Sequence, residues 1–133
     1  MNILLQTDLG EISVDKKFFA KKIMSVLMQF RWKGKFMPAN NSSKLLSEEN
    51  KPSIEAFADV LEVSQTTDGI SLSIPIIADF GMPLRSSTAE FIRDVYLEFG
   101  KMKVPIIKIT VHIVGVKSKQ VAPRNIKFTV NRK

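Results

Sequence analysis

The chain has 133 residues, of which 44% are apolar and 25% are charged, a composition typical of one soluble globular domain. It has no cysteine, which excludes disulfides, thiolate catalysis and cysteine-ligated zinc, and suits a reducing cytoplasm. Residues 1–100 hold 11 basic and 13 acidic residues, whereas residues 101–133 hold 9 basic residues and no acid, so the net charge of +7 is uneven. We expect neither a transmembrane segment nor a signal peptide.

The first pattern is a short strand followed by a basic helix. Residues 11–14 alternate polar and apolar side chains, which predicts a strand, and Asp15 is a suitable cap for a helix over 16–30. Positions 19, 23, 26, 27 and 30 form one apolar helical stripe. Four lysines lie largely off that stripe and are candidates for binding an anionic partner, although simple solvation also explains them: Lys16, Lys17, Lys21 and Lys22.

Aromatic and basic residues alternate in the next segment, 30–36, which reads FRWKGKF. This pattern is typical of surfaces that stack on bases or lie at a lipid interface. Arg31, Trp32 and Lys33 are therefore further candidates for binding a partner or an anion. The alternative is a helix end that turns at Gly34, with the aromatic side chains folded back on the core.

A polar segment and a hairpin follow. Residues 38–53 are rich in Asn, Ser, Lys, Glu and Pro, which predicts a flexible loop, and residues 54–58 fit a short helical turn. Residues 59–66 and 70–76 have the features of strands joined by a Thr-Asp-Gly turn, which predicts a β-hairpin. Pro75 has no amide hydrogen to donate to a ladder, so we expect it at an edge or a bulge, where a partner strand has access.

A sharp corner separates the hairpin from a second helix. Phe80-Gly81-Met82-Pro83 stops the strand: Gly81 permits the turn and Pro83 precedes the helix. We interpret Pro75, Gly81 and Pro83 as architecture rather than as a ligand site. Ser87-x-x-Glu90 has the spacing of a capping box, and apolar residues at 92, 95, 99 and 102 continue at helical spacing.

The C-terminal quarter contains one clear strand within a basic segment. Residues 105–116 alternate apolar residues with Lys108, Thr110 and His112, and residues 125–130 predict an extra strand or an ordered tail. A segment of one charge sign attracts phosphates, so Lys117 and Lys119 are also candidates for partner or anion binding. The alternative is a solvated strand face with a basic tail over 118–133.

These elements predict an α+β fold in a single domain over residues 1–133. The expected order is β-α-loop-β-β-α-β, with the extra C-terminal strand as an option. A small, mostly antiparallel sheet with two helices packed on one face is the natural two-layer sandwich for this order.

The sequence contains no convincing catalytic set. His112 is the only histidine, so there is no histidine cluster for a metal, and it has no partner at the level of sequence. The six glycines are scattered and form no phosphate-binding loop. We therefore expect a protein that is not an enzyme and that has no metal site and no cofactor.

Four patterns together resemble one family. They are GEISVD before a helix, DGISLSIPIIADFGMPL with its aromatic-glycine corner, FIRDVYLEFG closing a helix on glycine, and IIKITVHIVGVK as a late strand. In order and spacing, residues 10–117 are similar to the alkaline shock proteins of Gram-positive bacteria and their relatives, the envelope stress response proteins. The segment after the first helix and the tail after Lys119 depart from the family pattern.

The resemblance implies a non-enzymatic scaffold protein of the cell-envelope stress response. It implies a cytoplasmic location, peripheral at the membrane through a protein partner that is itself integral to the membrane, and also self-association. The basic helix face, the segment 30–36 and the C-terminal charge favour an alternative, a small basic module that binds RNA or another nucleic acid.

Overall fold

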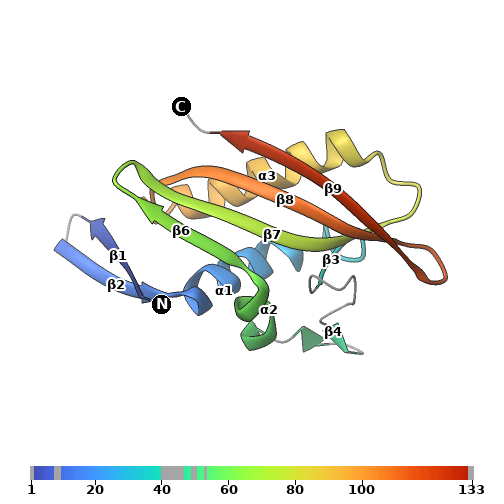
Figure 1. Cartoon of the computed structure of the whole chain (residues 1–133), viewed down its shortest axis with the longest axis horizontal. Coiled ribbons are helices and arrows are strands. Elements are labelled where there is room, and N and C mark those ends of the chain that lie inside the picture. Colours follow the sequence, from blue (N-terminus) through green and yellow to red (C-terminus); the bar gives the residue numbers. More distant parts are fainter. Residues whose placement is uncertain (1, 8–9, 40–46, 49–50, 53, 132–133) are drawn as a thin grey trace.

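The fold is an α+β sandwich with three helices and a mixed five-stranded sheet, seen in a computed structural model (Figure 1) that describes residues 2–7, 10–39, 47–48, 51–52 and 54–131. The elements in chain order are β1 (Asn2–Thr7), β2 (Gly10–Asp15), α1 (Lys16–Leu27), β3 (Phe36–Pro38), β4 (Ser47–Glu48), β5 (Lys51–Pro52), α2 (Ile54–Val60), β6 (Glu62–Thr66), β7 (Gly69–Asp79), α3 (Leu84–Gly100), β8 (Ile106–Lys117) and β9 (Val121–Asn131).

The main sheet is built around β7. Its order is β3-β7-β8-β9, and β6 pairs with β7 as well. The β7–β8 pair is parallel and is joined through α3, whereas β3–β7, β6–β7 and β8–β9 are antiparallel. The mostly antiparallel sheet of the prediction is therefore confirmed, and the optional C-terminal strand exists as β9.

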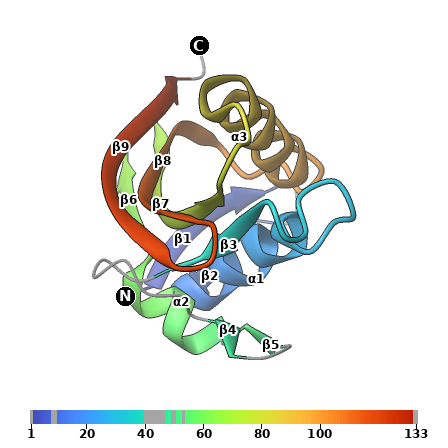
Figure 2. The same cartoon turned by 90° about the vertical axis from the view of Figure 1, so that its right-hand side faces the viewer.

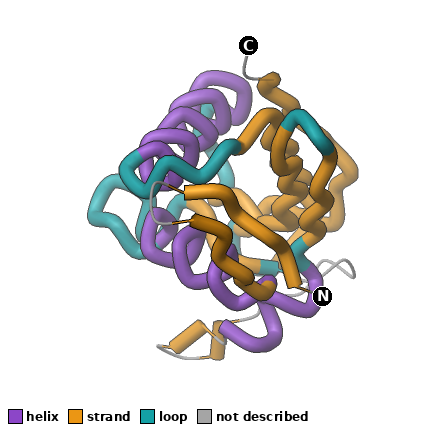
Figure 3. Tube along the Cα trace, turned by 90° about the vertical axis from the view of Figure 1, so that its left-hand side faces the viewer, coloured by secondary structure: helices purple, strands orange, loops and turns teal. Residues whose placement is uncertain are grey.

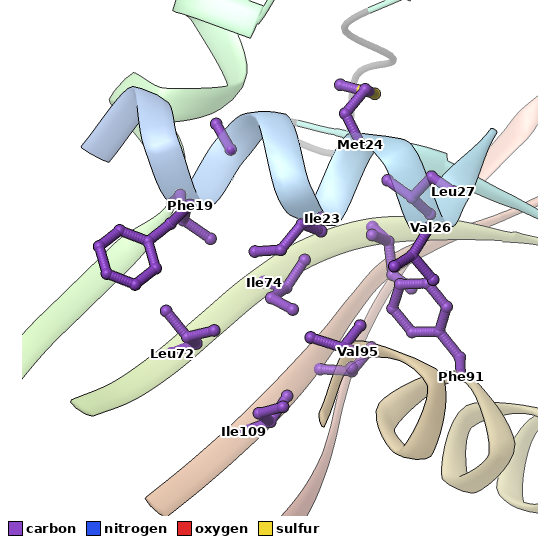
Figure 4. Close-up of a cluster of buried hydrophobic side chains, with 14 of the residues drawn as sticks. Phe19, Ile23, Met24, Val26, Leu27, Leu72, Ile74, Phe91, Val95 and Ile109 are labelled. Carbon is purple, nitrogen blue, oxygen red and sulfur yellow. The ribbon is translucent and has the colours of Figure 1, made fainter. Parts of the chain in front are cut away.

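The helices cover one face of this sheet, and the opposite face stays open (Figures 2 and 3). The apolar stripe of α1 is buried: Phe19, Ile23 and Leu27 belong to the core, and Phe19 and Ile23 point toward β7, the strand that carries Leu72 and Ile74 (Figure 4). Each such side chain contributes about 1.5–3 kcal/mol when fully buried. A separate antiparallel hairpin, β1–β2, lies at one end of the sandwich (Figure 1).

Two predicted boundaries were wrong. The first helix ends at Leu27 rather than at residue 30, and the predicted strand over 59–66 begins only at Glu62, because the preceding residues form α2. Phe57 and Leu61 are buried in the same core as α1, so tertiary packing extends the expected helical turn at 54–58. Of the predicted flexible loop over 38–53, residues 40–46, 49–50 and 53 lie outside the described residues.

The two helix caps behave differently. Asp15 caps α1 as predicted, since its side chain accepts from the N–H groups of Lys17 (3.0 Å) and Phe18 (3.4 Å). The capping box at Ser87 was wrong: α3 begins at Leu84 with Pro83 as its cap residue, so Ser87 lies inside the first turns and is buried. Proline has the backbone φ that a helix start requires, here −68°.

Pro75 is not at the edge of the sheet, which corrects the prediction. It lies in β7, buried and opposite His112 of β8. On the other side of β7, the pairing with β6 ends at Ser73 and the pairing with β3 starts at Ile76, opposite Pro38. Pro75 therefore lies between two short partner strands, and on this side its carbonyl accepts from the Ala39 N–H at 3.3 Å, while its ring nitrogen has no hydrogen to return.

The corner after β7 matches the prediction. Gly81 has φ of +89°, a value that a side chain disfavours, and Pro83 caps the following helix. Phe80 is exposed at this corner, and its N–H donates to the carbonyl of Lys117 at 2.7 Å. A depression of about 490 Å³ lies beside the corner and reaches Arg31 and Glu90.

Candidate functional site

An apolar groove of about 680 Å³ runs between α3 and the end of β9. The two elements lie side by side at the top of the molecule in Figures 1 and 2. The helix residues in the groove follow i, i+3, i+4, i+7 and i+8 spacing, so they form a second stripe along α3. The lining consists of Ala89, Ile92, Arg93, Tyr96, Leu97, Gly100, Lys101, Val130 and Asn131.

Apolar side chains in this groove remain open to solvent. Leu97 is 56% exposed and Val130 is 39% exposed, and both are large hydrophobic residues. Ile92 is buried behind them, and the Tyr96 hydroxyl donates to the Val130 carbonyl at 2.7 Å, which ties the helix to the strand. Adjoining apolar surface of this kind marks binding sites more often than scattered exposed residues do.

Charge is divided between the two flanks of α3. The groove flank carries Arg93, which forms no ion pair within the described part of the chain, and Lys101, whose Nζ lies 3.5 Å from Glu98. The opposite flank carries the acids Glu90 and Asp94. Arg93 therefore places a positive charge at the rim of the groove that no described acid pairs with, whereas Lys101 is already paired with Glu98.

The hydrogen bonds between β7 and β8 show to which side each residue of these strands directs its backbone N–H and C=O groups. Consecutive residues of a strand point their backbone groups to opposite sides. The N–H groups of Ile70 and Phe80 donate toward β8, to the carbonyls of Pro105 (2.8 Å) and Lys117 (2.7 Å), so the even-numbered residues of β7 point to β8. In a parallel pair, the β8 residue opposite an even-numbered β7 residue directs its own N–H and C=O groups away from β7. Ile109 is such a residue, so its N–H and C=O groups point to β9.

The free edge of β9 follows from that orientation. Val130 lies opposite Ile109, which makes them a hydrogen-bonded antiparallel pair. The N–H and C=O groups of Thr129 and Asn131 then point to the outer edge of β9. Because β9 is the last strand in the order of the sheet, that edge lies open beside the groove.

The predicted segment 30–36 lies on the closed flank of α3. Trp32 is only 2% exposed, so it is a core side chain and has no surface for stacking on a base or a lipid. Its indole N–H donates to the Asp94 carboxylate at 2.7 Å, and its ring packs on Phe36 and Phe91. The alternative with aromatics folded on the core therefore holds for Trp32, whereas Phe30 is 99% exposed.

Arg31 and Lys33 have different surroundings from each other. Arg31 is held by Glu90 (2.8 Å) and Asp94 (3.5 Å), and its guanidinium lies 4.8 Å from the Trp32 ring centre. The positive charge of Arg31 is therefore already paired with acidic side chains of this chain. Lys33 is exposed.

The remaining predicted lysines do not gather at one site. The four on α1 belong to the helix layer, where Lys17 and Lys21 are exposed, Lys16 and Lys22 are half-buried, and Lys17 lies 3.5 Å from Glu55. Lys117 and Lys119 lie at the β8–β9 turn, at the tip of the sheet (Figure 1). The two sets therefore make no common basic face.

The open face of the sheet carries a second, polar depression of about 410 Å³. Its floor is made of hydroxyl side chains in cross-strand register, including Thr110 and Thr129, whose oxygens are 2.9 Å apart. Lys108 and Lys127 border it, and neither forms an ion pair with another described residue. The alternation of β8 in the sequence already placed Lys108 on a polar face, but nothing local joined it to Lys127.

His112 Nε2 lies 2.7 Å from the Asn125 amide oxygen. No three His, Cys, Asp or Glu side chains come together as metal ligands within the described ranges. In the same part of the chain, no helix combines the length and the apolar composition that crossing a membrane needs.

Sequence reasoning missed the groove. The apolar residues of α3 were seen only as one stripe, and the strand over 125–130 had no assigned neighbour, so nothing placed Leu97 against Val130. Comparison of the chain with protein-family models, with curated proteins and with solved structures found no match.

Proposed function

We propose that this chain is a non-enzymatic interaction module and that a partner protein docks in the groove between α3 and β9. The observation that carries this proposal is an apolar groove, with Leu97 and Val130 exposed, directly beside an open strand edge. A protein partner suits both features, because it covers apolar side chains and supplies backbone partners at the same time.

The resemblance over residues 10–117 gives this module a setting. We propose a scaffold of the envelope stress response type, located in the cytoplasm at the membrane face and held there by an integral-membrane partner. Self-association is part of the same proposal. The groove provides an attachment surface for such a partner, which the resemblance alone did not locate.

Crosslinking in the cells of origin tests the docking surface. A photo-crosslinkable residue is placed at position 97, in the groove, and in a second variant at position 21, on the solvent face of α1. We expect protein adducts from position 97 and not from position 21, with membrane fractions retained. Equal adducts from both positions, or none from position 97, would contradict the proposal.

Nucleic-acid binding is the second candidate, favoured by the open sheet face. Neither Lys108 nor Lys127 forms an ion pair there with another described residue, and the sequence from 101 to 133 contains no acid. Trp32 is buried, so binding would rest on phosphate contacts and fall steeply with salt. Filter binding of RNA should weaken when both lysines are changed to alanine. Absence of binding at low salt excludes this candidate.

A further inference from the structure

The groove exists because the sheet is narrower than its helix layer. α3 packs its Phe91, Val95 and Phe99 side against the sheet, but β9 is the last strand. The flank of α3 that carries Leu97 therefore extends beyond the sheet edge and stays exposed. One more strand beside β9 would cover this flank in the same way that β7 and β8 cover the rest.

We infer that the groove takes an extended acidic segment of the partner, which adds to β9 as a sixth strand. This inference rests on the proposed function, because it names the chemistry of the partner at that same groove. Strand addition requires unpaired backbone groups, and Thr129 and Asn131 supply them, since their N–H and C=O groups point to the edge. The groove end of β9 contains no proline or inward-pointing charge to block pairing.

Because successive side chains of a strand point to opposite faces, the bound segment is expected to alternate apolar and acidic residues. Side chains of an added strand point alternately to the α3 layer and to the open face. Those toward α3 meet Leu97 and Val130 and are therefore apolar. Those on the open face lie beside Lys127, an exposed lysine. There, attraction to Lys127 stabilises a carboxylate, and repulsion from it destabilises an ammonium group.

The charge of the surroundings selects an acidic segment over a second copy of this chain. Arg93 and Lys101 line the groove, and Arg124 and Lys127 lie on β9 itself. Pairing two copies through β9 would bring these like charges together, and like charges opposite each other destabilise a strand pair. A segment rich in Asp or Glu instead places carboxylates beside Arg93 and Lys127, neither of which forms an ion pair with another described residue.

Peptide titration of the purified full chain tests the inference. The probe is a fluorescent peptide of about eight residues, a common strand length, in which valine and glutamate alternate. A matched peptide alternates valine and lysine, and a third carries N-methyl groups on alternate backbone amides of the valine-glutamate sequence. We expect binding of the first peptide only. Equal binding of the lysine peptide, or of the N-methylated peptide, overturns the acidic segment or the strand addition respectively.

One pair of variants separates strand pairing from side-chain contact. Thr129→Pro removes an edge-facing N–H that has no partner in β8, and Thr129→Ala keeps that N–H while losing the same hydroxyl. We expect Thr129→Pro to bind the valine-glutamate peptide roughly tenfold more weakly than Thr129→Ala does, which corresponds to the loss of one hydrogen bond. Equal affinities overturn strand addition; matched circular-dichroism melts of the two variants establish that both fold.

The outcome also separates this inference from the proposed function. If position 97 crosslinks to a protein in cells but the chain binds no valine-glutamate peptide, the interaction module stands and the sixth strand is wrong. If the peptide binds and position 97 yields no adduct in cells, the groove accepts strands but is not the docking site of a cellular partner.

Discussion

The two flanks of α3 differ in how completely the rest of the chain covers them. On one flank, the segment after α1 folds back and closes the surface: Trp32 is buried, donates to Asp94 and packs on Phe91. On the other flank, the Tyr96 hydroxyl donates to the Val130 carbonyl of β9, and an apolar groove remains between the helix and the strand.

This difference shows that apolar exposure on α3 is local rather than general. Acids on the closed flank have basic partners within the chain, as Glu90 has Arg31 at 2.8 Å. The basic rim of the groove includes Arg93, which has no such partner among the described residues. Contacts within the chain therefore cover the closed flank, whereas the open flank keeps Leu97 exposed.

Trp32→Ala should destabilise the closed flank most. The change removes a 2% exposed indole and leaves a cavity, so we expect the free energy of unfolding to fall by about 3–5 kcal/mol. Urea denaturation measures it. Phe30→Ala is the control, because a 99% exposed side chain should change stability by less than about 0.5 kcal/mol. Similar costs for both changes would contradict the assignment of Trp32 to the core.

Trp32→Phe should have a smaller effect, because it keeps an aromatic ring and removes only the indole N–H donor and some volume. We expect a loss of about 2 kcal/mol, typical of a hydrogen bond to a charged acceptor. Repeating the change in an Asp94→Ala background should lower that cost, since the acceptor is then absent. An unchanged cost in that background would show that the 2.7 Å contact contributes nothing.

Tyr96→Phe tests the hydrogen bond from the Tyr96 hydroxyl to the end of β9. The ring stays and the hydroxyl that donates to Val130 is lost, so we expect a loss of about 1 kcal/mol in unfolding free energy. Amide hydrogen exchange at the C-terminal end of β9 should rise with it. If exchange there stays unchanged, this bond does not hold β9 against the helix.

Leu97→Glu should change stability least. Leu97 is 56% exposed, and a glutamate there is four residues from Arg93 and from Lys101, a favourable spacing on a helix. We expect the free energy of unfolding to stay within about 0.5 kcal/mol, while binding of the valine-glutamate peptide is lost. Val95→Glu, on the buried side of the same helix, should instead unfold the chain. A large loss of stability from Leu97→Glu would show that the groove belongs to the core.

Several elements were predictable because their signals are local. The Asp15 cap depends on amides two and three residues ahead, and the Thr67–Gly69 turn joins strands whose register begins at Thr66 and Gly69. The alternation of β7 and β8 follows from the two-residue repeat of a strand. The helix boundary at Leu27 was missed, and the capping box assigned to Ser87 was wrong, because α3 already begins at Leu84, directly after Pro83.

Contacts between distant segments decided the rest. Trp32 is a core residue because Asp94, 62 residues away, accepts its N–H, and no local pattern distinguishes that from an exposed aromatic. Pro75 looked like an edge residue, yet the junction of β6 and β3 accommodates it inside the sheet. Strand order is a long-range property, set by which apolar faces bury each other. That order alone makes β9 the edge and opens the groove beside α3.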